Sequence, residues 1–181
     1  MTNAELAVLS LLAEQPRHGY EIESTIELRG MRDWTEIGFS SIYYILKKLE
    51  GQGWVESRLE QAQGRGPARR VFAITPAGVS AWQKGIRAAL SEPQPCYSPF
   101  QLGLAYLPSL PPQEAREALR QYRAGLAERR RYVLERRESS RAGMPPQVNA
   151  MFGLSLALIE AELGWVENFL LEMETGDEHQ D

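Results

Sequence analysis

The chain is poor in the residues that build metal sites and nucleophiles. It has one cysteine, Cys96, and two histidines among its 181 residues. A single thiol cannot form an intrachain disulfide, so a cytoplasmic address is expected. Without H-x-x-x-H or C-x-x-C spacing, neither a zinc site nor a Cys–His nucleophile can be assembled convincingly, and a glycine-rich phosphate loop is also missing. We therefore expect no metal, no cofactor and no enzymatic activity.

Long apolar runs are missing as well. No stretch approaches the roughly 20 apolar residues that a bilayer-spanning helix needs. Glu5 and Glu14 stand where a signal peptide would carry basic residues. The hydrophobic fraction of 43% and the charged fraction of 24% are those of an ordinary globular protein. We expect no membrane partner, and one good-sized domain or two small ones.

Positive charge is scarce overall, since the net charge is −4, but it is unevenly distributed. Residues 1–37 hold 3 basic and 7 acidic side chains, whereas residues 38–72 hold 6 basic and 3 acidic. Residues 111–141 are again basic, with 9 against 5, and residues 142–181 contain 8 acids and no Lys or Arg. The segment 38–72 is therefore a candidate surface for a polyanion.

Three helices are expected in the first fifty residues. Thr2 and Glu5 have capping-box spacing before a helix over 3–15, which Gln15-Pro16 ends. A second helix starts near His18 and ends at Gly30. A third covers about 39–52, and its core face has i, i+3, i+4, i+7 spacing. That face consists of Ile42, Ile45, Leu46 and Leu49.

A hairpin follows the third helix. WVESRLE (54–60) alternates with period 2 as a strand does, AQGRGPA (62–68) makes a turn, and RRVFAI (69–74) is the returning strand. Thr75-Pro76 then supplies an N-cap and an N1 proline for a fourth helix. This order predicts a winged helix-turn-helix, a fold that lays one helix in a DNA major groove and a basic hairpin against the backbone.

The predicted DNA contacts lie on the third helix and the hairpin. Serine hydroxyls at a helix start, a tyrosine and cationic side chains can all bind phosphate. On the helix these are Ser40, Ser41, Tyr44, Lys47 and Lys48, and on the hairpin Arg65, Arg69 and Arg70. Two alternatives stay open: the helix face is simply solvated, or the hairpin is a surface loop whose arginines keep the protein in solution.

Prolines mark a boundary in the middle of the chain. Six of the eleven lie between Ser91 and Pro112, so we expect a winged-helix domain over 1–92 and a linker over 93–110 with a short helix at 99–106. Two long helices, 111–141 and 145–175, should form a C-terminal helical dimerisation domain. The tail 176–181 is expected to be disordered. The fold class is therefore mainly α with a two-stranded wing.

The last helix carries a heptad seam of apolar residues stepping by 4, 3, 4, 3, 4, 3. The seam consists of Phe152, Leu156, Ile159, Leu163, Val166, Leu170 and Met173. A second apolar stripe lies beside it, and only the preceding helix is available within the chain to cover both. A second copy of the protein is the natural partner, so the seam is predicted to form a homodimer.

Two further features leave alternatives open. The run RRRYVLERR (129–137) is either a second DNA patch or, as we favour, an arginine face that pairs with the acidic last helix. The four tryptophans are most simply core or interface residues. Alternatively, one or two aromatic side chains line a pocket for a small aromatic or apolar effector.

HGYEI (18–22), SSIYYILKKLEGQGWVES (40–57) and RRVFAITPAG (69–78) resemble, in order and spacing, the signature blocks of the PadR family of bacterial transcriptional regulators. EAELGWVENFL (160–170) is similar to the family's longer branch. The resemblance implies a homodimer that represses its target at a pseudo-palindromic operator until an effector binds. It also implies that Tyr20 contacts DNA. The competing hypothesis is a winged-helix protein-interaction module that has no operator.

Overall fold

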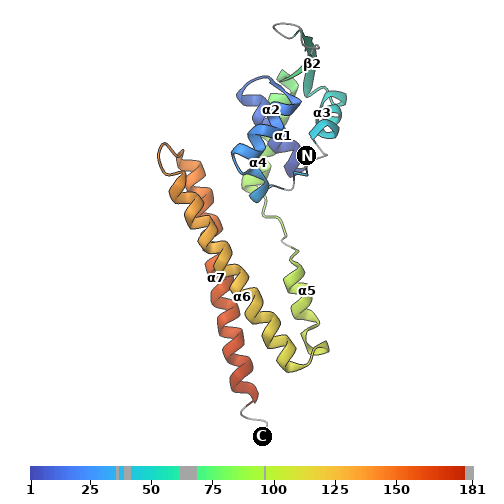
Figure 1. Cartoon of the computed structure of the whole chain (residues 1–181). Coiled ribbons are helices and arrows are strands. Elements are labelled where there is room, and N and C mark those ends of the chain that lie inside the picture. Colours follow the sequence, from blue (N-terminus) through green and yellow to red (C-terminus); the bar gives the residue numbers. More distant parts are fainter. Residues whose placement is uncertain (36, 39–41, 62–68, 96, 178–181) are drawn as a thin grey trace. The chain divides into compact units, whose positions relative to one another are not determined.

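The protein consists of two compact units, Met1–Pro95 and Cys96–Asp181, in a computed structural model (Figure 1). The structure describes residues 1–35, 37–38, 42–61, 69–95 and 97–177. The first unit contains helices and a small sheet, and the second contains helices alone. The prediction of a mainly helical chain with an N-terminal winged helix is confirmed. Among the described residues, no helix has the length and hydropathy of a bilayer span.

The helices of the first unit begin and end at the predicted signals. Thr2 accepts a hydrogen bond from the Glu5 N–H and Glu5 accepts one from the Thr2 N–H, which completes the capping box. Thr75 caps the fourth helix, whose first residue is Pro76. Gly30 has φ 60° and begins the short 3-10 turn η1. The helices are α1 (Asn3–Glu14), α2 (Gly19–Leu28), η1 (Met31–Asp33), α3 (Ile42–Gly51) and α4 (Pro76–Ser91).

The sheet contains the predicted hairpin and one strand more. β2 (Val55–Glu60) and β3 (Arg69–Ile74) pair antiparallel, from Val55 opposite Ile74 to Glu60 opposite Arg69. β1 (Arg17–His18) pairs with the free edge of β3, which gives the order β1-β3-β2. The expected two-stranded wing is therefore part of a three-stranded sheet. A strand of two residues shows no period-2 pattern, so the sequence had no signal for it.

The core of the first unit is closed. Its members come from α1, α2, η1, the connector before α3, α3 and the sheet. The predicted core face of α3 is buried throughout. Trp82 on α4 covers one side, and its indole Nε1 donates to Ser10 Oγ at 2.9 Å. The most deeply buried side chains are Val8, Leu9, Leu11, Leu12, Ile22, Ile26, Ile42, Leu46, Leu49 and Val55.

The base of the wing requires a glycine at the start of α4. A Cβ on Gly78 would lie 2.0 Å from the carbonyl oxygen of Trp54, a distance that no side chain can occupy. That same carbonyl oxygen accepts the N–H of Thr75 at 3.0 Å. The contact holds the start of α4 against the residue that leads into β2, and so fixes the sheet against the helices.

The second unit is a long helical hairpin with a short helix packed on it. α6 and α7 lie side by side (Figure 1), and Gly143, with φ 75°, sits in the turn between them. Helix α7 extends past the predicted end at residue 175, and residues 178–181 of the expected disordered tail lie outside the described residues. The helices are α5 (Pro99–Ala105), η2 (Leu107–Ser109), α6 (Pro112–Ser139) and α7 (Pro146–Asp177).

The predicted dimerisation seam is buried within the chain. Leu156, Ile159, Val166 and Leu170 are buried, and Leu119 and Leu126 of α6 belong to the same core cluster as Val166. The remaining seam residues, Phe152, Leu163 and Met173, are half-buried. The seam therefore serves mainly to pack α7 on α6. A heptad pattern does not specify which partner covers it. That the seam also joins two copies stays a prediction.

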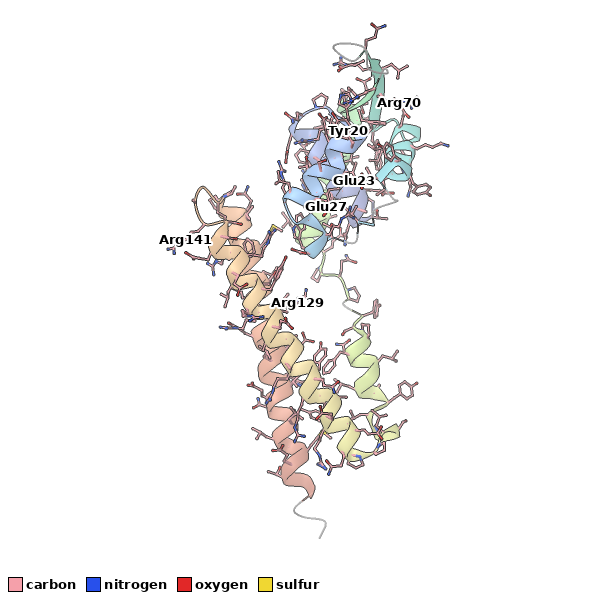
Figure 2. The ribbon with its side chains drawn as sticks, in the orientation of Figure 1. Tyr20, Glu23, Glu27, Arg70, Arg129 and Arg141 are labelled. Atoms are coloured by element: carbon pink, nitrogen blue, oxygen red, sulfur yellow. The ribbon has the colours of Figure 1, made fainter. Side chains whose placement is uncertain are left out.

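Polar contacts along the hairpin follow the charge pattern. Arg130 Nε lies 2.9 Å from Glu160 Oε1, and Arg120 Nη2 lies 3.2 Å from Glu174 Oε1. An arginine of the 129–137 run thus pairs with the acidic last helix, as we favoured. Arg129 and Arg141, labelled in Figure 2, are both exposed. Exposed ion pairs of this kind add little stability but favour one register of the two helices.

Candidate nucleic-acid interface

Helix α3 presents two tyrosines and two lysines to solvent. Because positions 42, 45, 46 and 49 face the core, the helical repeat directs the intervening residues outward. Tyr43 is 61% exposed and Tyr44 is 70% exposed, and Lys47 and Lys48 are exposed as well. Large aromatic rings left in water on a helix, one turn before two lysines, form a surface suited to a partner rather than to the core.

The N-terminus of α2, helix α3 and strand β3 surround a hollow. It brings together four of the predicted DNA contacts: Tyr20, Lys47, Arg69 and Arg70. Tyr20 and Arg70 lie at the wing end of the first unit in Figure 2. The side chains that line the hollow are His18, Tyr20, Tyr43, Lys47, Glu50, Arg69, Arg70 and Phe72, together with Gly19.

Tyr20 connects α2 to the base of the wing. The guanidinium of Arg69 lies 5.3 Å from the centroid of the Tyr20 ring, and Arg69 Nη1 donates to Tyr20 Oη at 3.1 Å. The Tyr20 ring also stacks with the His18 ring, with centroids 5.5 Å apart. His18 Nδ1 lies 3.2 Å from the Arg70 carbonyl oxygen. These contacts hold the two arginines of β3 beside the start of α2.

Five lining residues were not among the predicted contacts, and His18 and Tyr43 are the two that a sequence signal could have indicated. His18 belongs to the HGYEI block, and its position directly before a helix was the available signal. Tyr43 lies one turn before Lys47, and this i, i+4 spacing could have placed it on the same face. A Cβ on Gly19 would come within 2.6 Å of the Tyr43 ring, so glycine allows α2 to begin against that ring.

The hollow is electropositive but contains one carboxylate. Lys47, Arg69 and Arg70 contribute positive charge, and Glu50 contributes the negative charge. The Glu50 carboxylate accepts from Ser57 Oγ at 2.5 Å and lies 3.8 Å from Arg70 Nη1. Since Glu50 is engaged by these neighbours, the positive charges of Lys47 and Arg69 set the potential that an anion would meet.

Lys48 does not line the hollow. Its Nζ lies 2.5 Å from Oε1 of Glu5, a residue of α1 whose side chain is buried. Burial raises the pKa of Glu5, but hydrogen bonds from Lys48 and from the Thr2 N–H outweigh it, so this pKa is lowered. The hydrogen bond to Glu5 in turn raises the pKa of Lys48. The structure thus separates two lysines that the sequence analysis treated alike.

Several predicted positions lie outside the described residues. These are Ser40, Ser41 and Arg65. Within the described ranges, no three His, Cys, Asp or Glu side chains come together as metal ligands would.

The second unit contains a cluster of stacked aromatic rings. Phe100 of α5 stacks on Tyr122 of α6 with centroids 3.9 Å apart, and Trp165 stacks on Phe169 of α7 at 5.0 Å. The Tyr122 hydroxyl donates to Glu162 at 2.6 Å. Burial, together with this bond to the carboxylate, raises the pKa of Tyr122 to about 12. The stacked rings bury one another's faces and hold α5 against the α6–α7 hairpin.

The fold and the cationic hollow together define a winged helix-turn-helix protein. Residues 8–84 match the model of the transcriptional regulator PadR-like family. Over these residues, which make up less than half of the chain, the sequence is similar to that family of transcriptional regulators. No protein of curated function matches the sequence.

Solved structures of similar fold cover nearly the whole chain. Bacillus subtilis PadR in complex with operator DNA is 22% identical, with 93% of this chain and 98% of that chain covered and a TM-score of 0.75. The same protein in complex with p-coumaric acid is 21% identical, with 94% and 98% covered and a TM-score of 0.72. The Vibrio cholerae virulence activator AphA is 19% identical, with 95% and 98% covered and a TM-score of 0.72. At these identities the likeness establishes the fold.

Proposed function

We propose that this chain is a sequence-specific regulator that binds an operator in double-stranded DNA as a homodimer and represses transcription until a small molecule binds. The observation that supports the proposal best is the hollow at α2, α3 and β3. It gathers Lys47, Arg69 and Arg70 in a chain whose net charge is −4. A local excess of positive charge on a winged helix is what binding to the phosphate backbone requires.

In this proposal α3 enters the major groove. Tyr43 and Tyr44 are the rings available for contacts with bases or sugars, and Lys47 is placed for a phosphate. Arg69 and Arg70 bind the backbone beside the groove, with Tyr20 holding Arg69 in place. Ser40 and Ser41 remain predicted phosphate contacts at the start of α3, and Arg65 remains a predicted contact of the wing tip. The solved complex of Bacillus subtilis PadR with operator DNA supports the proposal that a chain of this fold binds an operator.

The dimer is proposed to form on a second face of α7. Met151, Leu154, Leu158 and Trp165 follow i, i+3, i+7, i+14 spacing and share one face of the helix, and we call them the α7 stripe. Leu154 and Leu158 are each 63% exposed. A two-fold axis through such a stripe pairs it with itself and removes the apolar surface from water.

The effector is proposed to be a small aromatic or apolar molecule. The structure of Bacillus subtilis PadR in complex with p-coumaric acid supports a ligand of this kind. A cytoplasmic address accompanies a function in transcription. The direction of regulation needs its own test, since another protein of this fold is described as a virulence activator. A reporter gene behind the operator should be repressed by the chain and released when the effector is added.

The test of DNA binding begins with genomic fragments that the protein selects from the source genome. On a selected fragment, affinity should fall steeply with salt, because each phosphate contact releases counterions and adds about 0.9 to the log–log slope. Arg70→Ala should reduce that slope, whereas Arg141→Ala, an exposed arginine of the second unit, should leave it unchanged. A slope near zero for the wild-type chain would contradict the proposal and favour a winged-helix protein-interaction module without an operator.

A further inference from the structure

Lys47 and Lys48 are neighbours on α3 but point to different surroundings. Lys47 lines the hollow with Arg69 and Arg70, and no ion pair holds its ammonium among the residues that the structure describes. Lys48 reaches toward α1, where its Nζ lies 2.5 Å from Glu5. Two adjacent lysines therefore differ in their surroundings: Lys47 faces the hollow, and Lys48 pairs with a carboxylate.

The Glu5 carboxylate is buried, so it needs the positive charge of Lys48. It lies in the first turn of α1, only 4% exposed, and its carboxylate accepts from the Thr2 N–H at 2.9 Å. A buried carboxylate is stable only when its charge is compensated, and removing one partner of such a pair is strongly destabilising. If a DNA phosphate attracted Lys48 away, it would leave the Glu5 carboxylate buried without its cation.

We propose that Lys48 is a positioning residue that fastens the recognition helix α3 to the start of α1 through Glu5, and that Lys47 is the lysine of α3 that binds a DNA phosphate. This inference rests on the proposed function. It revises the sequence-based expectation that both lysines contact DNA. The Lys48–Glu5 contact fixes the position of α3 on the core, and with it the positions of Lys47 and Tyr44. DNA affinity therefore depends on Lys48 although Lys48 does not contact DNA.

The first test compares the salt dependence of two matched variants. The probe is a fluorescein-labelled duplex of mixed sequence, and binding is followed by anisotropy at several salt concentrations. Lys47→Gln should lower the log–log slope by about 0.9 for each bound protomer. Lys48→Gln should weaken binding several-fold at every salt concentration with the slope unchanged, and Lys48→Arg should restore it. An equal loss of slope in both variants would overturn the proposal, as would unchanged affinity in Lys48→Gln.

The second test is a double-mutant cycle on thermal stability. Lys48→Gln should lower the melting temperature by several degrees, because it leaves Glu5 uncompensated. Glu5→Gln combined with Lys48→Gln should melt above the temperature that the two single effects predict by addition. Glu5→Gln with Lys47→Gln is the control pair and should be additive. If the effects of Glu5→Gln and Lys48→Gln on the melting temperature simply added, Lys48 would not hold α3 to α1 through Glu5.

The two tests separate this inference from the proposed function. If the wild-type chain shows no salt-dependent binding to the duplex, the proposed function fails, and the assignment of Lys47 fails with it. The stability cycle does not use DNA, so it decides by itself whether Glu5 and Lys48 are coupled. The whole inference is supported if Glu5 and Lys48 are coupled in stability and if the salt slope of DNA binding changes in Lys47→Gln but not in Lys48→Gln.

Discussion

The two units of this protein differ in how completely they cover their apolar side chains. In the first unit, helices and a sheet enclose the core, and Leu9, Ile22 and Leu46 have no exposed surface. In the second unit the α6–α7 hairpin buries one face of α7, while Leu154 and Leu158 on another face remain 63% exposed. The first unit closes its core alone, and the second leaves an apolar face uncovered.

This difference separates the tasks of the two units. A layer of two long helices can bury only the faces that meet, so each helix keeps an outer face that needs another partner. In the first unit, exposed tyrosines and cations gather around α3 and the wing base, where the proposal places DNA. Binding DNA and pairing two copies are therefore assigned to different surfaces, and each can be damaged without damaging the other.

The largest expected effect comes from charges in the α7 stripe. Leu154→Glu combined with Leu158→Glu should convert a dimer into a monomer, because two buried carboxylates would replace apolar contacts at the interface. Sedimentation equilibrium measures the mass. Leu28→Glu, at a leucine of the first unit that is 85% exposed, is the matched control and should leave the mass unchanged. A stripe variant that remains dimeric would contradict the proposed interface.

A smaller effect concerns the closed packing of the first unit. Gly78→Ala should destabilise this unit by about 1–3 kcal/mol, since its new methyl group cannot fit against the Trp54 carbonyl without moving the backbone. Gly125→Ala in α6 meets nothing within 4 Å and should stabilise its helix by about 0.8 kcal/mol. Urea denaturation measures both. If Gly78→Ala did not lower the free energy of unfolding, Gly78 would not be packed closely against the Trp54 carbonyl, contrary to the structure.

The smallest expected effect is on pH dependence, and it also belongs to the first unit. The pKa of Glu5 is lowered from the ordinary value of 4.5. A lowered pKa contributes stability that is complete above 4.5 and is lost as the pH falls through the lower, folded-state value. As the pH falls below 4.5, wild-type stability should therefore decrease more than that of Glu5→Gln. Equal decreases in the two proteins would show that Lys48 does not stabilise the Glu5 carboxylate.

Local patterns predicted most of the first unit. The core face of α3 and the β2–β3 hairpin were found because helical spacing, strand alternation and turn residues are local patterns, formed by residues close together in the sequence. The start of α4 was found for the same reason, since Thr75 and Pro76 are a local capping signal. Strand β1 was not found, because its two residues become a strand only by pairing with β3.

What sequence could not decide was which distant groups meet. Glu5 and Lys48 lie 43 positions apart, and only the packing of α1 on α3 shows that Lys48 has a carboxylate to hold. The seam of α7 was identified as apolar, but its spacing could not show that α6 covers much of it within the chain. Periodicity shows that Val166 and Leu158 lie on apolar faces, and only the structure shows that α6 covers the first and leaves the second exposed.

Hydroxyl-radical footprinting of the wild-type protein on a fragment it selects tests the central claim most directly, because it reports DNA contact and pairing together. A dimer with one α3 in each of two major grooves should protect two patches about 10 base pairs apart, related by a two-fold axis. The Leu154→Glu, Leu158→Glu variant should lose the paired pattern. A single protected patch for the wild type, or no protection at low salt, would contradict the account.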